Sequence, residues 1–186
     1  MTISASLPSP LGELILVSDG SALTGLRFAG QRHFPRGLPD PGPVSASEVF
    51  EDTVRWLELY FSGKPPSFLP RLSPEGTAFQ RAVWERLLLI PYGKTVTYAA
   101  LADGLRTSAR AVGGAVGRNP ISLIIPCHRV VGASGALTGY AGGIGRKEAL
   151  LRLERGGSIS KRHRSNEGCL FCGIFRFIPG CRRTRP

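Results

Sequence analysis

The stretch SARAVGGAVGRNPISLIIPCHRVV, residues 108–131, decides the fold of this chain. Its first ten positions hold mostly small residues, which predict a short helix with an almost bare surface. The apolar run at 121–125 predicts a buried strand, and Pro126 should end it. A cysteine, a histidine and an arginine follow in consecutive positions. The stretch thus combines a helix that can approach another surface closely with a candidate reactive thiol at the end of a strand.

A second short helix is predicted upstream, over YAALADGL, residues 98–105. Two short helices separated by a tight glycine-containing connection are typical of a helix-turn-helix. Thr-Ser at 107–108 offers the N-cap of the second helix, and Asn-Pro at 119–120 should end it. Its small residues fit close packing in the core, which is the commoner case, or an approach to the floor of a DNA groove. Arg110 and Arg118, at its two ends, favour DNA.

The rest of the chain predicts a mixed helix and sheet fold. ELILVSDGSALTGLRF, residues 13–28, is typical of an antiparallel hairpin about a Ser-Asp-Gly-Ser turn. Apolar residues at helical spacing predict helices over 47–64, 78–90 and 145–154. The glycine-rich segment 130–143 predicts a hairpin and a loop. We expect these side chains to face the core: Phe50, Val54, Leu57, Phe61, Phe79, Val83, Leu87, Ile90, Ala149, Leu150 and Leu153.

Composition divides the chain into two domains and a tail. Residues 65–77 contain four prolines and are typical of a linker. We therefore expect a sheet-and-helix domain over 1–70 and a helix-turn-helix domain over 71–156, followed by a basic, disordered tail over 157–186. A chain of 186 residues is long enough for this arrangement.

Charge points to a polyanionic partner. The formal net charge is +11, and residues 155–186 hold eight basic residues and one acid, so that 1–154 carry +4 and the tail +7. This balance favours nucleic acid, although a solvated tail without a partner fits the tail equally well. The chain shows no secretory signal and no run near the ~20 apolar residues that cross a bilayer. We therefore expect a cytoplasmic protein with reduced thiols and no membrane association.

Cys127 is the candidate nucleophile, because it is the only cysteine before the tail. A thiol with the ordinary pKa of ~8.5 is only a few per cent ionised at neutral pH, so activation needs a base or a cation. His128 and Arg129 offer both, directly or through a bridging water. Glu148 and Glu154 are the nearest downstream acids that could orient the imidazole. The alternative is a cysteine that acts as a small buried hydrophobe beside an ordinary core histidine.

Several motifs together resemble the O6-alkylguanine-DNA alkyltransferases, which are methylated-DNA–protein-cysteine methyltransferases. They are PYGKTVTY, SARAVGGAV, RNP, IPCHRVV and GYAGGIGRKEALLRLE, all between Phe79 and Glu154. SPLGELILVSDGSALTGLRF is similar to the family's N-terminal sheet domain. The resemblance implies an α/β (α+β) fold, with an N-terminal ribonuclease-H-like sheet domain and then a winged helix-turn-helix alkyltransferase domain. The segment from Tyr98 to Arg110 is slightly shorter than the family pattern.

The resemblance also implies roles for individual residues. Cys127 would accept the alkyl group as a thioether, and His128, oriented by Glu154, would act as its water-mediated base. Asn119 would brace the active-site turn. Tyr98 would help to rotate the nucleotide and donate a proton to the leaving guanine. The implied DNA contacts are Arg110, which would fill the gap in the base stack, with Gln80, Ala99, Ala111, Gly113 and Arg118; the implied pocket residues are Val130, Tyr140, Ala141, Gly142 and Gly143.

The implied function is DNA repair. The alkyl group of O6-alkylguanine in duplex DNA would move irreversibly to Cys127 of a monomeric protein that flips the base out and reacts once, with O4-alkylthymine open as a second substrate. The implied partner is double-stranded DNA that contains the lesion, without a cofactor or a metal. Residues 1–126 contain no cysteine, so the zinc that some family members carry near the N-terminus has no thiol ligands here.

Two other classes of protein stay open. A non-catalytic winged-helix DNA binder would bind duplex DNA without transferring an alkyl group. A cysteine hydrolase would use the same cysteine and histidine but would turn over. The tail matches nothing in the family, and a disordered extension or an altered reading frame at the 3′ end of the gene fits it better than a zinc site would. Such a site would use Cys169, Cys172, Cys181 and His163.

Overall fold

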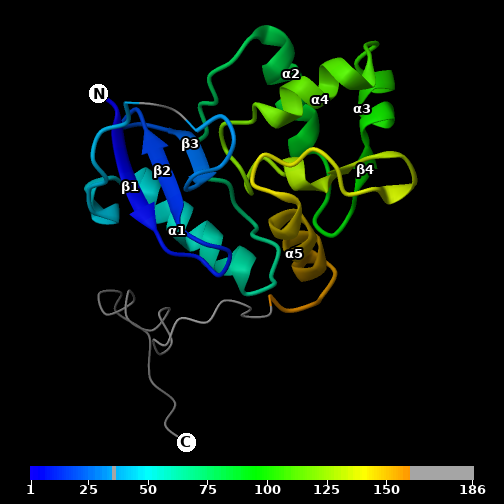
Figure 1. Ribbon diagram of the computed structural model, residues 1–186. Coiled ribbons are helices and arrows are strands. Elements are labelled where there is room, and N and C mark those ends of the chain that lie inside the picture. The colour runs from blue at the N-terminus through cyan, green and yellow to red at the C-terminus, as the bar shows by residue number, and fades with distance from the viewer. Residues whose placement is uncertain (35–36, 160–186) are drawn as a thin grey trace, which may run out of the picture.

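The protein is described by a computed structural model that covers residues 1–34 and 37–159 (Figure 1). Its N-terminal part is an antiparallel sheet of the strands β1 (Ile3–Leu7), β2 (Leu14–Ser18) and β3 (Leu23–Phe28) in that order. The predicted hairpin is β2 and β3, in which Leu14 pairs with Phe28. The sequence analysis missed β1, a five-residue edge strand whose alternation includes small residues and which pairs fully with β2.

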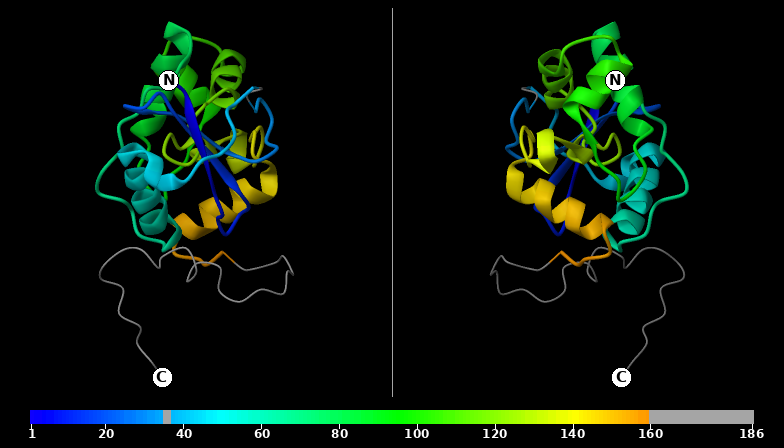
Figure 2. Two further views of the ribbon diagram at one scale, coloured as in Figure 1. Left: turned by 90° about the vertical axis from the view of Figure 1, so that its left-hand side faces the viewer. Right: turned by 90° about the vertical axis from the view of Figure 1, so that its right-hand side faces the viewer.

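One long helix covers the sheet. After the short 3-10 helix η1 (Val44–Ala46), α1 (Glu48–Phe61) buries Phe50, Trp56, Leu57 and Tyr60. Figure 2 shows the strands between α1 and α5 (Ile144–Glu154), which places the core on both sides of the sheet. The predicted helix at 47–64 is confirmed, with both ends slightly shorter.

The second part contains the helix-turn-helix. Its elements are α2 (Ala78–Leu88), β4 (Val96–Thr97), α3 (Tyr98–Gly104), α4 (Ala109–Gly117), β5 (Val130–Val131) and α5 (Ile144–Glu154). The helices α3 and α4 pack on each other, and α4 also packs on α2. Ser108 is the N-cap of α4, because its hydroxyl accepts a hydrogen bond from the amide of Ala111 at 3.2 Å. The predicted pair of short helices is confirmed.

The predicted buried strand at 121–125 is wrong. The segment is fully buried but irregular, with Leu123 in the left-handed region at φ 71° and one isolated bridge from Ile121 to Leu26. The physical reason is the side chain of Asn119, which accepts from the amide of Ile121 and donates to the carbonyl of Ile125. These bonds satisfy backbone groups that a strand would otherwise pair, so the segment forms a compact loop.

Three smaller expectations also fail. Residues 130–143 do not form a hairpin, because β5 pairs in parallel with β4 and the 3-10 helix η3 (Ala133–Gly135) follows. Phe79 is exposed because α2 buries a stripe that contains Trp84, whose indole donates to the carbonyl of Ala115 at 2.9 Å. Ala149 is only half-buried. In the described part of the chain, no helix is long and apolar enough to cross a membrane.

Candidate active site

Cys127 lies on a sharp turn rather than at the end of a strand. Pro126, at φ −81° and ψ 62°, leads into the 3-10 helix η2 (Cys127–Arg129), and the thiol is 5% exposed. The side-chain amide of Asn119 donates through Nδ2 to the sulfur at 3.1 Å and to the carbonyl of Ile125 at 2.8 Å. One side chain therefore holds both the turn and the thiol in place.

A carboxylate orients the neighbouring imidazole. His128 is fully buried, and its Nε2 lies 2.7 Å from Oε1 of Glu154, the last residue of α5. The hydroxyl of Tyr60, from α1, donates to the same oxygen at 2.7 Å. Within the described residues, Nδ1 of His128 is buried without a hydrogen-bond partner. Nε2 therefore carries the proton toward the carboxylate, and Nδ1 is left as the basic nitrogen.

Arg129 serves the carboxylate and not the thiol, which corrects the sequence-based interpretation. Its Nε donates to Oε2 of Glu154 at 2.9 Å, and its Nη2 donates to Oε1 at 3.0 Å. The backbone amide of Gly93 adds a further bond to Oε2 at 2.9 Å. Burial alone would raise the pKa of the Glu154 carboxyl, but the bonds and charges of His128 and Arg129 more than offset it and lower the pKa to about 2. The acid is thus ionised at any working pH.

The thiol and the imidazole are both neutral at rest. Burial raises the pKa of Cys127, against the lowering effects of the Asn119 hydrogen bond and the charge of Lys147. Burial lowers the pKa of His128, although Glu154 acts in the opposite direction. A neutral imidazole beside a protonated thiol is the state from which a base can remove a proton as the sulfur attacks.

Lys147 is the cation whose charge lowers the pKa of the Cys127 thiol, and the sequence analysis missed it. It is fully buried in α5, and its ammonium donates to the carbonyls of Val130 and Thr138. It thus joins β5 to the loop that precedes Tyr140. The lysine lies within the matched motif GRKEALLRLE, but no spacing rule marks a single helical lysine as buried.

Two tyrosines meet at the loop that precedes α5. Burial is the main cause of the raised pKa of both Tyr98 and Tyr140, and a negative charge on Cys127 would raise it further. The Tyr98 hydroxyl donates to the carbonyl of Thr138 at 3.3 Å. A Cβ atom at Gly142 would lie 2.7 Å from the Tyr140 ring, so only glycine lets the loop pass there.

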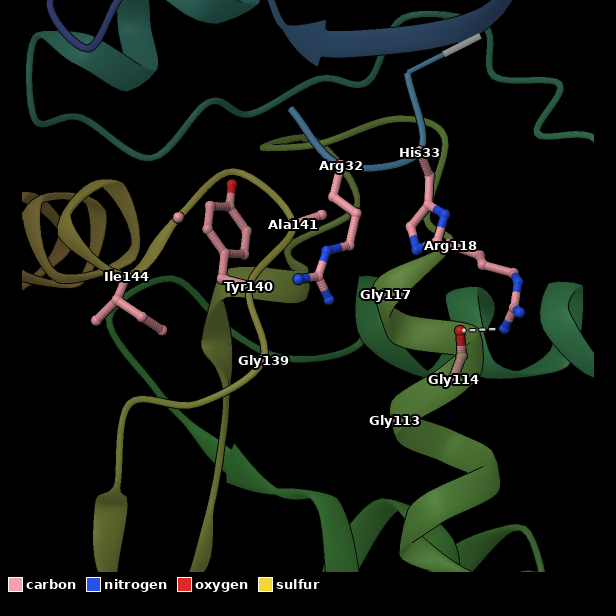
Figure 3. Close-up of a pocket in the computed structure, with 11 residues that line it drawn as sticks. Arg32, His33, Gly113, Gly114, Gly117, Arg118, Gly139, Tyr140, Ala141 and Ile144 are labelled. Carbon is pink, nitrogen blue, oxygen red and sulfur yellow. Dashed lines mark hydrogen bonds between the residues drawn. The ribbon is translucent and has the colours of Figure 1, made fainter. Parts of the chain in front are cut away.

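A cavity of about 600 Å³ opens beside Tyr140 (Figure 3). One wall is the small-residue face of α4, a second is the loop from Gly139 to Ile144, and the third is the loop after β3. Of the predicted pocket residues, Tyr140, Ala141 and Gly143 line this cavity. Gly142 packs behind Tyr140, and Val130 is fully buried in β5.

The residues predicted to contact DNA differ in their exposure and in their contacts within the protein. Ala99, Arg110, Ala111 and Arg118 are exposed on the helix-turn-helix, and Gly113 lines the cavity. The Gln80 side chain instead completes a capping box at the start of α2, where it accepts from the amide of Thr77 at 2.9 Å. That bond gives Gln80 a structural task as well, so its DNA contact stays a prediction.

Two groups in the centre carried no sequence signal. Tyr60 is a core position of α1 and lies 94 residues from the carboxylate it binds. Gly93, at φ 74°, stands where a Cβ would lie 2.9 Å from the carbonyl of Glu154. Among the described residues, no group of three or more His, Cys, Asp and Glu side chains could hold a metal ion. The cysteines of the proposed tail site lie outside these residues.

A buried cysteine next to a His-Glu pair, in a domain that contains a helix-turn-helix, is the arrangement expected of a DNA-binding protein with a reactive thiol. Two family models match the chain: the ribonuclease-like domain of 6-O-methylguanine DNA methyltransferase over 3–74, and the DNA binding domain of the same family over 78–156.

Individual relatives agree with these models. The methylated-DNA–protein-cysteine methyltransferase of Mycobacterium tuberculosis is 49% identical over 155 residues, 81% of this chain and 90% of its own length. That of Methanosarcina acetivorans is 46% identical over 153 residues, 81% and 96%. The crystal structure of Mycobacterium tuberculosis OGT in complex with DNA is 47% identical with a TM-score of 0.73, over 83% of this chain and 94% of that one. The chain belongs to the O6-methylguanine DNA methyltransferase family.

Proposed function

We propose that this protein repairs O6-alkylguanine in duplex DNA by moving the alkyl group to Sγ of Cys127. The observation that carries this proposal is the pairing of two arrangements at one turn: Asn119 donates to the thiol of Cys127, and Glu154 binds Nε2 of the next residue, His128, whose buried Nδ1 has no hydrogen-bond partner among the described residues. The family and its named relatives support DNA as the substrate.

The proposed reaction forms one bond and breaks one. The sulfur attacks the alkyl carbon, the bond from that carbon to O6 breaks, and the electron pair leaves with guanine. The thiol proton passes to Nδ1 of His128 through a water, and Glu154 stabilises the resulting imidazolium. We assign to Tyr98 the transfer of a proton to the departing guanine, after which the proton held by His128 returns through water to restore the phenol and leave both groups neutral.

A buried thiol can act on a base only after the base leaves the helix. Unstacking costs a few kcal/mol, and an inserted side chain offsets part of it. Arg110 is exposed near the start of α4, where the bare surface of the helix would approach the minor groove. The product thioether has no ready leaving group, so we infer that each molecule reacts once, as a monomer. We also propose that it works in the cytoplasm, where its buried thiol stays reduced.

The test is intact-mass measurement after incubation with a duplex that contains O6-methylguanine. We expect one added methyl group, about 14 Da, in a peptide that contains Cys127, and one repaired lesion per protein molecule. Cys127→Ser should bind the duplex without transfer. A folded protein that leaves the lesion intact would instead be a non-catalytic DNA binder, and product in excess of protein would indicate a turnover enzyme.

A further inference from the structure

The cavity beside α4 carries a cluster of basic side chains. Among the described residues that line it, three are basic and none is acidic: Arg32, His33 and Arg118. In Figure 3 the Arg32 side chain extends into the space between the Tyr140 loop and α4, and His33 points toward α4 beside Arg118. Arg118 itself folds back on its helix, where Nη1 donates to the carbonyl of Gly114 at 3.2 Å. Among the described residues that line the cavity, the guanidinium without a hydrogen-bond partner is therefore that of Arg32.

The loop that bears Arg32 is held in place. Gln31 is buried, and its side chain accepts from the amide of Phe28 at 3.0 Å, which closes the turn after β3. The amide of Arg32 then donates to the carbonyl of Ala141 at 3.2 Å. His33 follows in the left-handed region at φ 61°, which is unusual for a residue with a side chain. The first part of the chain is thus tied directly to the wall of the base pocket.

The position of the cavity indicates which anion it receives. Tyr140 lines it, and Gly139, which also lines it, lies beside the Tyr98 hydroxyl, so the cavity adjoins both tyrosines on which a charge at Cys127 would act. When a base reaches Cys127, its sugar and phosphate stay nearer the surface, where the cavity opens. A guanidinium binds phosphate through two parallel hydrogen bonds, and no acid competes for Arg32 among the described lining residues.

We propose that Arg32 and His33 bind a backbone phosphate of the strand that carries the alkylated guanine. The ribonuclease-like domain then forms part of the DNA interface, whereas the family's DNA binding model begins only at residue 78. This inference rests on the proposed function, because it takes the everted nucleotide as the occupant of the site. Arg32 is a positioning residue: it holds the strand and does not touch the reacting atoms.

The test compares DNA binding with reaction on a base that has no phosphate. Binding is measured by fluorescence anisotropy with a methylated duplex, in the full chain carrying Cys127→Ser so that the lesion stays intact. Arg32→Ala should weaken binding roughly three- to tenfold near 0.1 M salt, and the slope of log affinity against log salt should become shallower by about 0.9, the value for one phosphate contact. Arg32→Lys should restore most of both.

Three comparisons make the result decisive. With Cys127 present, the Arg32→Ala protein should lose more of its rate on the duplex than on free O6-methylguanine. Lys64→Ala removes an equal charge from an exposed site after α1 and should change neither measurement. An unchanged salt slope, or equal losses on duplex and free base, would overturn the phosphate contact. If the unsubstituted protein transfers no methyl group at all, the proposed function fails instead.

Discussion

At the scale of single residues, Glu154 holds the centre together. Its two oxygens accept from Tyr60, His128, Arg129 and the amide of Gly93, so five hydrogen bonds meet at one buried carboxylate. Loss of the charge would leave Arg129 buried and unpaired, and breaking such a pair typically costs 3–5 kcal/mol. We therefore expect Glu154→Gln to lower the free energy of unfolding by about 3 kcal/mol at pH 7, measured by urea denaturation.

Stability should also depend on pH through this carboxyl. Its pKa is about 2 in the folded protein against an ordinary 4.5, so the unfolded chain binds its proton first as the pH falls. The stabilisation is present above pH 5 and is lost between pH 5 and 2, and it amounts to roughly 3 kcal/mol. Unfolding measured from pH 7 to 3 should show this loss in the unsubstituted protein and a shallower one in Glu154→Gln. Parallel curves would contradict it.

Lys147 gives a second test at this scale. Its charge lowers the pKa of Cys127, and its ammonium satisfies two carbonyls. Lys147→Met should raise the pKa of the thiol, so that its alkylation by iodoacetamide requires a higher pH, and should destabilise the fold by about 2 kcal/mol. Lys147→Arg keeps the charge and is the matched control. A midpoint of thiol reactivity that stays in place in Lys147→Met would show that the lysine acts only on the loop.

At the scale of helices and strands, the sequence predicted those elements whose formation depends on local patterns. The hairpin, α1 and the paired helices α3 and α4 follow local rules of alternation, helical spacing and capping, and all of them formed. The strand predicted at 121–125 is wrong because an apolar run indicates only that a segment is buried. The hydrogen bonds of Asn119 decide between a strand and a compact loop. Cys127 and His128 could be predicted from their motif, whereas Tyr60 and Lys147 required the tertiary structure.

The small residues on the surface of α4 predict that a bulky charged side chain there should weaken DNA binding. Ala111 is exposed in its first turn, so Ala111→Glu should fold normally while it places a negative charge against the DNA. We expect duplex affinity to fall about tenfold, since the substitution adds both bulk and repulsion. Reaction with free O6-methylguanine serves as the control and should change far less. Similar losses in both assays would mean that the substitution disturbs the pocket and not the interface.

At the scale of the whole molecule, the two matched domains share one centre. Tyr60 from α1 reaches Glu154, and Arg146 from α5 donates to the carbonyl of Leu11 at 2.9 Å while its guanidinium lies over the Phe28 ring at 4.5 Å. The boundary predicted within 65–77 is still a prediction. These contacts nevertheless explain why a motif confined to the second half depends on residues of the first.

We therefore expect cooperative unfolding of both domains. Tyr60→Phe should lower the free energy of unfolding by about 1–2 kcal/mol, because it removes a buried hydrogen bond to a charged group, and a single transition should remain. Circular dichroism and tryptophan fluorescence should give coincident curves, since Trp56 and Trp84 lie in different parts of the shared core. Two separate transitions would show that the domains are energetically independent.

The place of Glu154 at the end of α5 has a consequence for synthesis. The nucleophile leaves the ribosome 27 residues before the acid that orients its base, and domains generally form in the order in which they are made. A nascent chain therefore exposes a cysteine that lacks its catalytic partner. If each molecule reacts once, as we propose, its sulfur would gain the orienting acid only when the chain around it is complete.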